Sequence, residues 1–478
     1  MGVSSKTAVP RIAGRGPASA RILILLNPGR TSRHYMLGLA RAAQRLGILA
    51  GTLEMDSIWR RLSIGTRGGG PEPAVRRQVA REVLGFCTRA RVTHILGYLY
   101  NGVAEFGVAT GTDGRPEPVL AQQGIRHLLL WTDHPNWAVS GAALKEPARS
   151  LLAHPALTHI VKSEAAAEEL REVCAWPNVL GLPMAEDYET MRPARAPSSG
   201  ARHDAVVILG DAAPPPEPVH PFLSEDDPDP QSLMDAMRPS ARSTWSELLR
   251  EWTPPSEIAP ALERLGDALI DQRADRPLCS VWRLSQRLPP EHSAALRWLR
   301  ASPARWYKAV AALGLLTAWR RSFYLAWLGR RVDLGVYGEQ SSRLGLPTPP
   351  GADRWVEYEQ QPEVYAAGRV VININAAHDE EGLTHKPFQI AAAGAPCIHH
   401  ASLGMDRAFE PGEEIEVFQR ASGLLECVRR LAADDRRSEA LGAAMRRRAS
   451  REHNWEARLT AILRWEERAG LHAVESAA

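Results

Sequence analysis

Lysine is scarce in this sequence of 478 residues, and charge of neither sign dominates it. Lysines and arginines number 58 against 55 aspartates and glutamates, which leaves a net charge of +3, and arginine supplies nearly all of the positive charge. A balance this close to neutral does not require a nucleic-acid partner. The only lysines are Lys6, Lys145, Lys162, Lys308 and Lys386.

Cysteine is also scarce and shows no metal-binding spacing. Scattered thiols without a Cys-x-x-Cys pair favour a reducing compartment and unpaired cysteines. We therefore expect a cytoplasmic protein without a disulfide framework and without a metal site. The cysteines are Cys87, Cys174, Cys279, Cys397 and Cys427.

Long apolar runs are missing as well. Residues 1–20 contain basic and small residues but no apolar segment typical of a signal peptide, so we expect a disordered tail there. The longest apolar stretch, Ala309 to Trp319, is followed at once by Arg320 and Arg321. It is too short to span a bilayer and predicts a buried or amphipathic helix, with a membrane-surface helix as the alternative.

Strand and helix patterns alternate along the chain, which has the length of two ordinary domains. Arg21 to Leu26 is a short apolar strand, and Ser32 to Leu46 has the spacing of a helix that buries one face. The turn between them lacks the GxGxxG pattern of dinucleotide-binding folds. Alternation of this kind predicts an α/β fold with parallel sheets. Further strand candidates are His94–Leu99, His127–Trp131, His159–Val161, Ala205–Leu209 and Val332–Tyr337.

Changes in composition suggest the domain boundaries. Residues 193–203 are small, polar and proline-bearing, so we divide the chain there. A mainly helical pattern at about 232–329 interrupts the second half and predicts an insertion. The expected division is a tail over 1–20, domains over 21–195 and 196–465, and a second tail over 466–478.

The segment 367–396, which we term the cradle, is the most informative part of the sequence. Residues 370–374 predict a strand, an open acidic loop follows, and Lys386 to Ala393 predict a short helix with Thr384 as its N-cap and Gly394 at its left-handed stop. Ligands of open α/β sheets bind where strands end and helices begin, and unpaired helix N–H groups favour anions. The cradle is therefore predicted to hold an anionic ligand.

The cradle also resembles the nucleotide-sugar signature of GT-B glycosyltransferases, in particular the spore-maturation-type, glycosyl transferases group 1-like family. There an acidic residue precedes a glutamate by eight positions, and the matching pair here is Glu381 and Gln389, with glutamine in place of the usual glutamate. Other stretches resemble the family in the order it requires. They are residues 131–137 (WTDHPNW), 181–193 (GLPMAEDYETMRP), 334–340 (LGVYGEQ), 357–365 (EYEQQPEVY), 405–418 (MDRAFEPGEEIEVF) and 451–459 (REHNWEARL).

The resemblance implies an architecture and an activity. It implies two facing Rossmann-like domains, with the acceptor side in 21–195 and the nucleotide-sugar-binding domain in 196–465. It implies a bacterial-type, metal-independent hexosyltransferase without a cofactor. Such an enzyme moves a sugar from a nucleotide-diphosphate donor, for example a UDP-sugar, to an acceptor that the sequence does not identify as glycan, protein or small molecule.

Candidate site residues follow from the chemistry and the resemblance together. The resemblance puts Glu381 closest to the transferred sugar, while Asp133 or His134, after an apolar strand, could accept the acceptor's proton. Lys386 would offset phosphate charge, and Gln389 could hydrogen-bond the ribose. The predicted donor-binding set is Gly338, Glu339, Gly382, Leu383, Thr384, His385, Lys386 and Gln389.

Each of these residues also has a structural interpretation. Glu381 could belong to a merely solvated acidic loop, Lys386 could be a surface lysine, and Asp133 could cap a turn before Pro135. Gln389 could face solvent on its helix. At the level of function, the alternatives are a catalytically weakened nucleotide-sugar binder or partner subunit of the same fold, and a sugar-nucleotide epimerase.

Overall fold

The computed structural model describes most of the chain. The expected N-terminal tail, apart from Ala20, lies outside the described residues, as do the acidic neighbours of Glu381 in the cradle. The described residues are 20–63, 73–111, 114–135, 148–193, 202–210, 212–277, 279–339, 341–346, 349, 352–376 and 381–475.

The first domain is built around a parallel sheet in the order β2-β1-β3-β6-β7-β8. Its central strands are almost fully buried because helices cover both faces, as expected for parallel sheets. The strands are β1 (Arg21–Leu26), β2 (Leu49–Glu54), β3 (His94–Tyr98), β6 (Arg126–Leu130), β7 (Leu157–Val161) and β8 (Val179–Gly181).

The helices of this domain follow from local sequence signals. In α1 (Arg30–Arg45) the buried residues Tyr35, Leu39 and Ala42 recur at helical spacing. In α6 (Glu164–Cys174) the Ser163 hydroxyl caps the first turn by accepting a hydrogen bond from the Ala166 N–H. The remaining elements are α2 (Met55–Ser63), α3 (Pro73–Ala90), α5 (Ala148–Leu152), and a hairpin of β4 (Val108–Thr110) and β5 (Pro116–Pro118).

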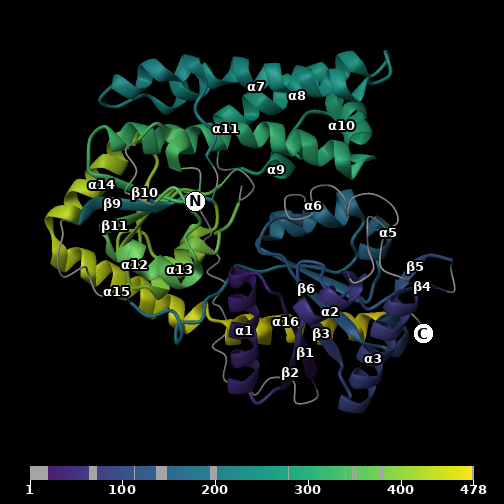
Figure 1. Ribbon diagram of the computed structural model, residues 1–478. Helices are drawn as coiled ribbons and strands as arrows, with labels where there is room; N and C mark the ends of the chain where they lie inside the picture. Colours follow the sequence, from purple (N-terminus) through teal and green to yellow (C-terminus); the bar gives the residue numbers. More distant parts are fainter. Residues whose placement is uncertain are drawn as a thin grey trace.

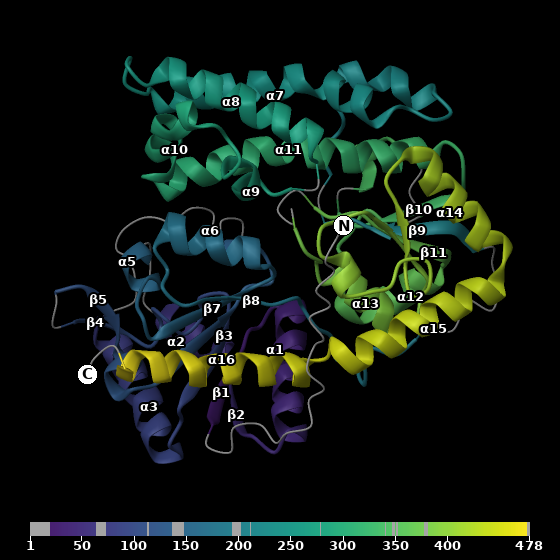
Figure 2. The same cartoon turned by 180° about the vertical axis from the view of Figure 1, so that it is seen from behind.

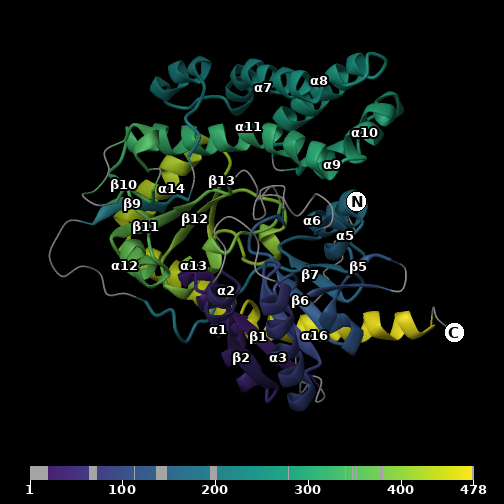
Figure 3. The ribbon, with the colours of Figure 1, turned by 45° about the vertical axis from the view of Figure 1, so that its right-hand side comes forward.

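The second domain has its own parallel sheet, in the order β10-β9-β11-β12-β13. In Figure 3, α11 runs along one face of this sheet, and α12 and α13 lie on the other. Two separate parallel sheets with covering helices confirm the predicted α/β fold of two Rossmann-like domains. The elements are β9 (His203–Ile208), β10 (Leu334–Tyr337), β11 (Gly368–Asn373), β12 (Cys397–His400), β13 (Glu416–Phe418), α12 (Gln361–Ala366), α13 (Lys386–Ala392), α14 (Ala421–Ala433) and α15 (Asp435–Glu452).

A layer of helices lies between β9 and β10 in the chain and extends over both domains (Figure 1). Among the described residues, no helix combines the length and the apolar character needed to cross a membrane. The apolar stretch at 309–319 instead lies in α11, whose Arg320 and Arg321 are buried within the protein. The layer consists of α7 (Pro230–Trp252), α8 (Ala259–Asp275), α9 (Val281–Ser285), α10 (Ser293–Arg300) and α11 (Pro303–Gly329), preceded by a 3-10 helix at Glu217–Ser224.

The last helix, α16 (Trp455–Glu475), leaves the second domain and packs on the first (Figure 2). Glu466 accepts a hydrogen bond of 2.7 Å from Arg126 Nε at the start of β6. Residues 466–475, which we expected as part of a tail, are therefore helical. Arg126 and Thr158, which both donate hydrogen bonds to Glu466, lie about 300 residues before it in the sequence. No local pattern could therefore indicate this contact.

Candidate active site

A cavity of about 850 Å³ lies between the two domains, where the strand ends of both sheets meet. The first domain contributes the turn after β1 and Asp133 after β6, and the second contributes Gly338, Asn373 and the residues that lead into α13. This is the position at which open α/β sheets bind ligands. The predicted site residues that line it are Asp133, Gly338, Thr384, His385 and Lys386.

The start of α13 differs from the prediction. The N-cap is His385 and not Thr384, although the Thr384 hydroxyl does accept a hydrogen bond from the Lys386 N–H. Pro387 has no N–H, and the N–H groups of Phe388 and Gln389 both donate to the His385 carbonyl. The N–H groups of Lys386, Phe388 and Gln389 are therefore paired within the protein. Side chains around the start of α13 are then the main candidates for holding an anion in this cavity.

Besides Arg30 of the first domain, two cationic side chains line the cavity from the second domain and the helical layer. Lys386 begins α13, and Arg321 reaches the cavity from α11 of the helical layer. The pKa of Lys386 is lowered to about 8, mainly because the side chain is buried away from water and to a smaller extent because Arg321 repels its charge. Two like charges held close together in a partly dry cavity favour an anionic ligand, because its charge would relieve both the repulsion and the desolvation.

Asn373 adds a polar group at the end of β11. It lines the cavity, is 8% exposed, and its Nδ2 has no hydrogen-bond partner among the described residues. A buried amide without a partner is costly unless a ligand or water completes it. Arg321 and Asn373 were not predicted, because an arginine in an apolar helix and an asparagine at a strand end carry no signal on their own.

Asp133 and His134 are adjacent in sequence but separate in space. Asp133 lines the cavity, and its Oδ1 lies 4.0 Å from Lys162 Nζ. His134 does not line the cavity, since its ring packs against Tyr307 and its Nε2 lies 3.7 Å from Glu169 Oε2. Of the two predicted proton acceptors, only Asp133 can reach a ligand between the domains.

Glu381 does not line the cavity and instead binds the helical layer. Its Oε1 accepts hydrogen bonds from both the backbone N–H and the hydroxyl of Ser280, at 2.9 and 2.7 Å. Ser280 is in turn the N-cap of α9. Arg283 lies 3.8 Å from the other Glu381 oxygen and pairs with Glu168 of the first domain at 2.7 Å. Glu381 thus connects the cradle with the layer that extends over both domains.

Gln389 is fully buried and also lies outside the cavity lining. Its Nε2 donates a 3.1 Å hydrogen bond to the hydroxyl of Tyr35 on α1. The residue that the resemblance assigns to ribose binding therefore joins the second domain to the first. Tyr35 itself lines the cavity.

The remaining predicted donor residues fall into two groups. Gly338 lines the cavity with a φ of +118°, and a Cβ there would lie 1.9 Å from the Leu209 carbonyl, so only glycine fits. Glu339 is exposed, Leu383 is buried in the core, and Gly382 lies against Ser163 of the first domain. These last three are not among the residues that line the cavity.

A contact between the domains lies at the rim of the cavity. Arg30 at the start of α1 pairs with Glu357 at 3.1 Å, and both line the cavity. Trp355, half exposed, lines the same rim. A large flat side chain at the opening offers a stacking surface for a planar ring. Within the described part of the chain, no three His, Cys, Asp or Glu side chains converge in a metal-binding arrangement.

Residues 320–464 match the family described as "Glycosyl transferase-like". The matched segment runs from the end of α11 into α16 and includes the whole cradle. It confirms, for this part of the chain, the resemblance to glycosyltransferases that the motifs indicate. The spore-maturation-type subdivision stays a prediction. No curated protein matches the chain.

Several solved structures resemble the chain along nearly all of its length. Sucrose-phosphate synthase from Thermosynechococcus elongatus has 14% sequence identity and a TM-score of 0.43, covering 95% of this chain and 100% of its own. A glycosyltransferase from Rickettsia africae has 9% identity and a TM-score of 0.42, covering 94% and 98%. HepE from Anabaena, solved in complex with UDP and glucose, has 10% identity and a TM-score of 0.41, covering 93% and 98%. At these scores the assignment of the fold rests on the two sheets themselves.

Proposed function

We propose that the chain is a GT-B-type glycosyltransferase that binds a nucleotide-diphosphate sugar in the cavity between its domains. The observation that carries the proposal is the pair of cations, Lys386 and Arg321, that lines this cavity at the strand ends. Loss of a sugar from its nucleotide leaves negative charge on the departing phosphate, and fixed positive charge stabilises it. The glycosyl transferase-like sequence of residues 320–464 supports the same activity.

In this proposal the second domain holds the donor. Lys386 and Arg321 bind the diphosphate, and Asn373 Nδ2 donates to a phosphate or sugar oxygen. Trp355 at the rim stacks on the base. The cations and the amide belong to the second domain and the layer above it, which leaves the first domain to the acceptor.

Asp133 is the proposed proton acceptor. It lines the cavity from the first domain, on the side where an acceptor hydroxyl would enter. A carboxylate within reach of that hydroxyl takes its proton as the new bond to the sugar forms. Lys162 Nζ, 4.0 Å from Asp133 Oδ1, helps to orient the carboxylate.

Glu381 has a positioning role in this proposal. Through Ser280 it fixes the loop that leads into Thr384 and Lys386, and through Arg283 it fixes that loop to the first domain. All five cysteines are buried and free, which suits the reducing cytoplasm that the sequence suggests.

Donor turnover tests the proposal. Purified protein is incubated with UDP-, GDP-, TDP- and ADP-sugars, and release of the nucleoside diphosphate is measured with and without a mixture of acceptor sugars. We expect release with one donor, and loss of release in Asp133→Asn and Lys386→Gln. Turnover that converts the donor into an isomer without releasing nucleotide would contradict transfer and favour an epimerase.

A weakened nucleotide-sugar binder is the second candidate, and the use of Gln389 and Glu381 in domain contacts favours it. Such a protein would bind a donor through Lys386 and Arg321 without turnover. Binding of one nucleoside diphosphate together with no release from any donor would support this candidate over the transferase.

A further inference from the structure

A second cavity, of about 520 Å³, lies within the first domain. Its walls come from the β4–β5 hairpin, from α5 and the loop after it, and from the end of α6. These elements lie on the side of the first domain that faces away from the second (Figures 1 and 2). Cavities that hold small molecules usually measure about 300 to 1,000 Å³, so this one has room for a ligand.

The second cavity is separate from the cavity between the domains. It is lined by residues that precede β7 and β8, whereas Asp133 follows β6. In a parallel sheet these are opposite edges, and a strand of five residues separates them by about 15 Å. The two cavities share no lining residue among the described part of the chain.

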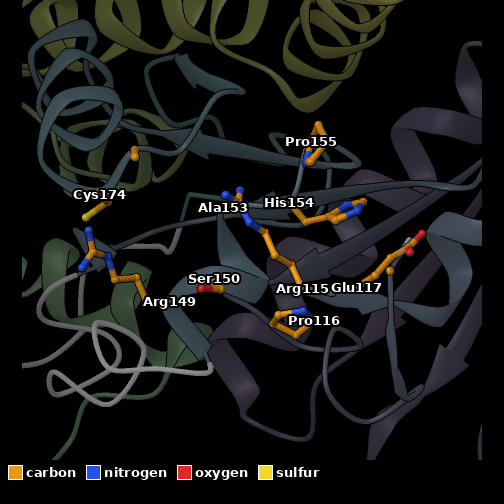
Figure 4. A pocket seen from close by; sticks show the side chains of 11 residues that line it. Arg115, Pro116, Glu117, Arg149, Ser150, Ala153, His154, Pro155 and Cys174 are labelled. Atoms are coloured by element: carbon orange, nitrogen blue, oxygen red, sulfur yellow. The ribbon is translucent and has the colours of Figure 1, made fainter. Parts of the chain in front are cut away.

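Two arginines, Arg149 and Arg115, make the lining of this cavity basic. Arg149 on α5 is half-buried, and its guanidinium makes no hydrogen bond or ion pair with any described residue. Figure 4 shows Arg115, from the hairpin, reaching between Arg149 on one side and His154 on the other. Partly burying a cation is unfavourable unless an anion or a hydrogen-bond acceptor offsets the lost hydration.

Histidine and serine add polar groups to the same cavity. His154 Nδ1 accepts a 3.1 Å hydrogen bond from the Ala156 N–H, so the proton of the neutral ring is on Nε2, which is then a donor. Ser150 lies one turn before it on α5. Glu117 is the acidic residue of the lining, and in Figure 4 it lies beyond Arg115 as seen from Arg149. Besides two arginines, the lining therefore holds a serine hydroxyl and an imidazole against the single carboxylate of Glu117, and it is positive in charge.

The cavity is suited to binding and not to thiol chemistry. Cys174 contributes to the lining, but burial raises the pKa of its thiol to about 12, and its sulfur lies 3.7 Å from the Tyr307 hydroxyl. The reactive form of cysteine is the thiolate. Cys174 is therefore a packing residue in the lining of the cavity.

We propose that this cavity is a second ligand site, which binds the oxyanion of a small molecule through Arg149 and Arg115. A phosphate and a carboxylate share the geometry that a guanidinium recognises with two parallel hydrogen bonds. His154 and Ser150 supply further donors around the same group. The site is independent of the donor cavity, so it stands whether or not the chain transfers sugars.

Titration calorimetry at constant ionic strength tests the proposal. Every variant carries Lys386→Gln, which removes one of the cations of the other cavity. Glucose 6-phosphate and glucuronate are the probes, and glucose is the neutral control. Added to this background are Arg149→Gln, Arg115→Gln, and Arg77→Gln as a matched control, since Arg77 is an exposed arginine on α3 of the same domain.

We expect saturable binding of at least one anionic probe and none of glucose. Binding should weaken at least tenfold in Arg149→Gln and in Arg115→Gln, and stay within twofold in Arg77→Gln. Binding of only one anion shows which of the two the site prefers, and binding of either or both supports the site. If Arg149→Gln does not fold, binding by the Arg115→Gln variant decides the result, because Arg115 is exposed and its replacement should not affect folding.

Two results would overturn the proposal. One is the absence of binding by both anions in the Lys386→Gln background. The other is unchanged binding in Arg115→Gln and Arg149→Gln, because the anion would then be held elsewhere on the protein.

Discussion

Gln389 Nε2 donates a 3.1 Å hydrogen bond to the hydroxyl of Tyr35, across the interface between the two domains. Both side chains are almost fully buried, and burial raises the pKa of Tyr35 well above its usual value, so its hydroxyl keeps its proton. In the family that the cradle resembles, a glutamate occupies this position and binds the donor. Here the position fixes the domains to each other.

Restoring the glutamate is therefore expected to harm the protein. Gln389→Glu places a carboxyl group where the buried amide donates a bond, which should lower the free energy of unfolding by about 1–3 kcal/mol. Urea denaturation followed by tryptophan fluorescence measures this, with Tyr35→Phe as the matched loss of the same bond. An increase in donor affinity without loss of stability would contradict the structural role and indicate a ribose contact.

Diphosphate affinity should depend on pH through Lys386. Its pKa is lowered to about 8, and only the protonated form attracts phosphate, so affinity should fall as pH rises above 8. Between pH 7 and pH 9 we expect a loss of about tenfold for a single deprotonation. Calorimetric titration with UDP across this range gives the profile.

Lys386→Arg provides the control for that profile. Arginine stays charged throughout the range, so the variant should bind with little change between pH 7 and pH 9. A flat wild-type profile would show that the charge of Lys386 does not contribute to diphosphate binding. A pH dependence that persists in the arginine variant would assign that dependence to another group.

Glu381 should act through Ser280 and not through the sugar. Glu381→Ala removes both hydrogen bonds to residue 280, and Ser280→Ala removes the one from the hydroxyl, so each should lower stability, and a double-mutant cycle should give a coupling of about 1–2 kcal/mol. Turnover should fall in both variants, because the loop before Lys386 loses its support. Glu339→Ala, at an exposed strand end, is the matched control.

The opposite result would support direct contact between Glu381 and the transferred sugar, as the resemblance implies. If Glu381→Ala abolished turnover at unchanged stability while Ser280→Ala behaved as wild type, Glu381 would have to contact the transferred sugar directly.

Asp133→Asn should separate chemistry from binding. The substitution keeps the shape of the side chain but removes the proton acceptor, so turnover should fall by about 10² to 10⁴-fold. Donor affinity should stay within about twofold of the wild-type value, because the diphosphate contacts lie in the other domain. His134→Asn, on the neighbouring residue outside the cavity, should retain turnover.

The fold was predictable from the sequence to a large extent because buried parallel strands leave a local signal. β1 was expected at Arg21–Leu26 and lies there, and the positive φ of Gly394 agrees with the predicted end of α13. The path of α16 was not predictable, since Glu466 meets Arg126 only in the folded chain.

The site was predictable in outline and not in detail. The cradle and Asp133 do come together at the cavity, because both follow strand ends. Spacing alone could not show that Glu381 and Gln389 point away from it, since their partners Ser280 and Tyr35 come from the helical layer and the first domain. Arg321 was missed for a related reason, because its neighbours in sequence are those of a buried helix.

Nucleoside diphosphate binding tests the central claim most directly. Wild-type protein, Lys386→Gln, and Arg149→Gln as a control in the separate cavity are titrated with UDP, GDP, TDP and ADP by calorimetry at pH 7. We predict that at least one diphosphate binds the wild type at a ratio of one to one, with affinity at least tenfold weaker in Lys386→Gln and within twofold in Arg149→Gln. Failure of all four to bind, or equal affinity in Lys386→Gln, would contradict the proposed donor site.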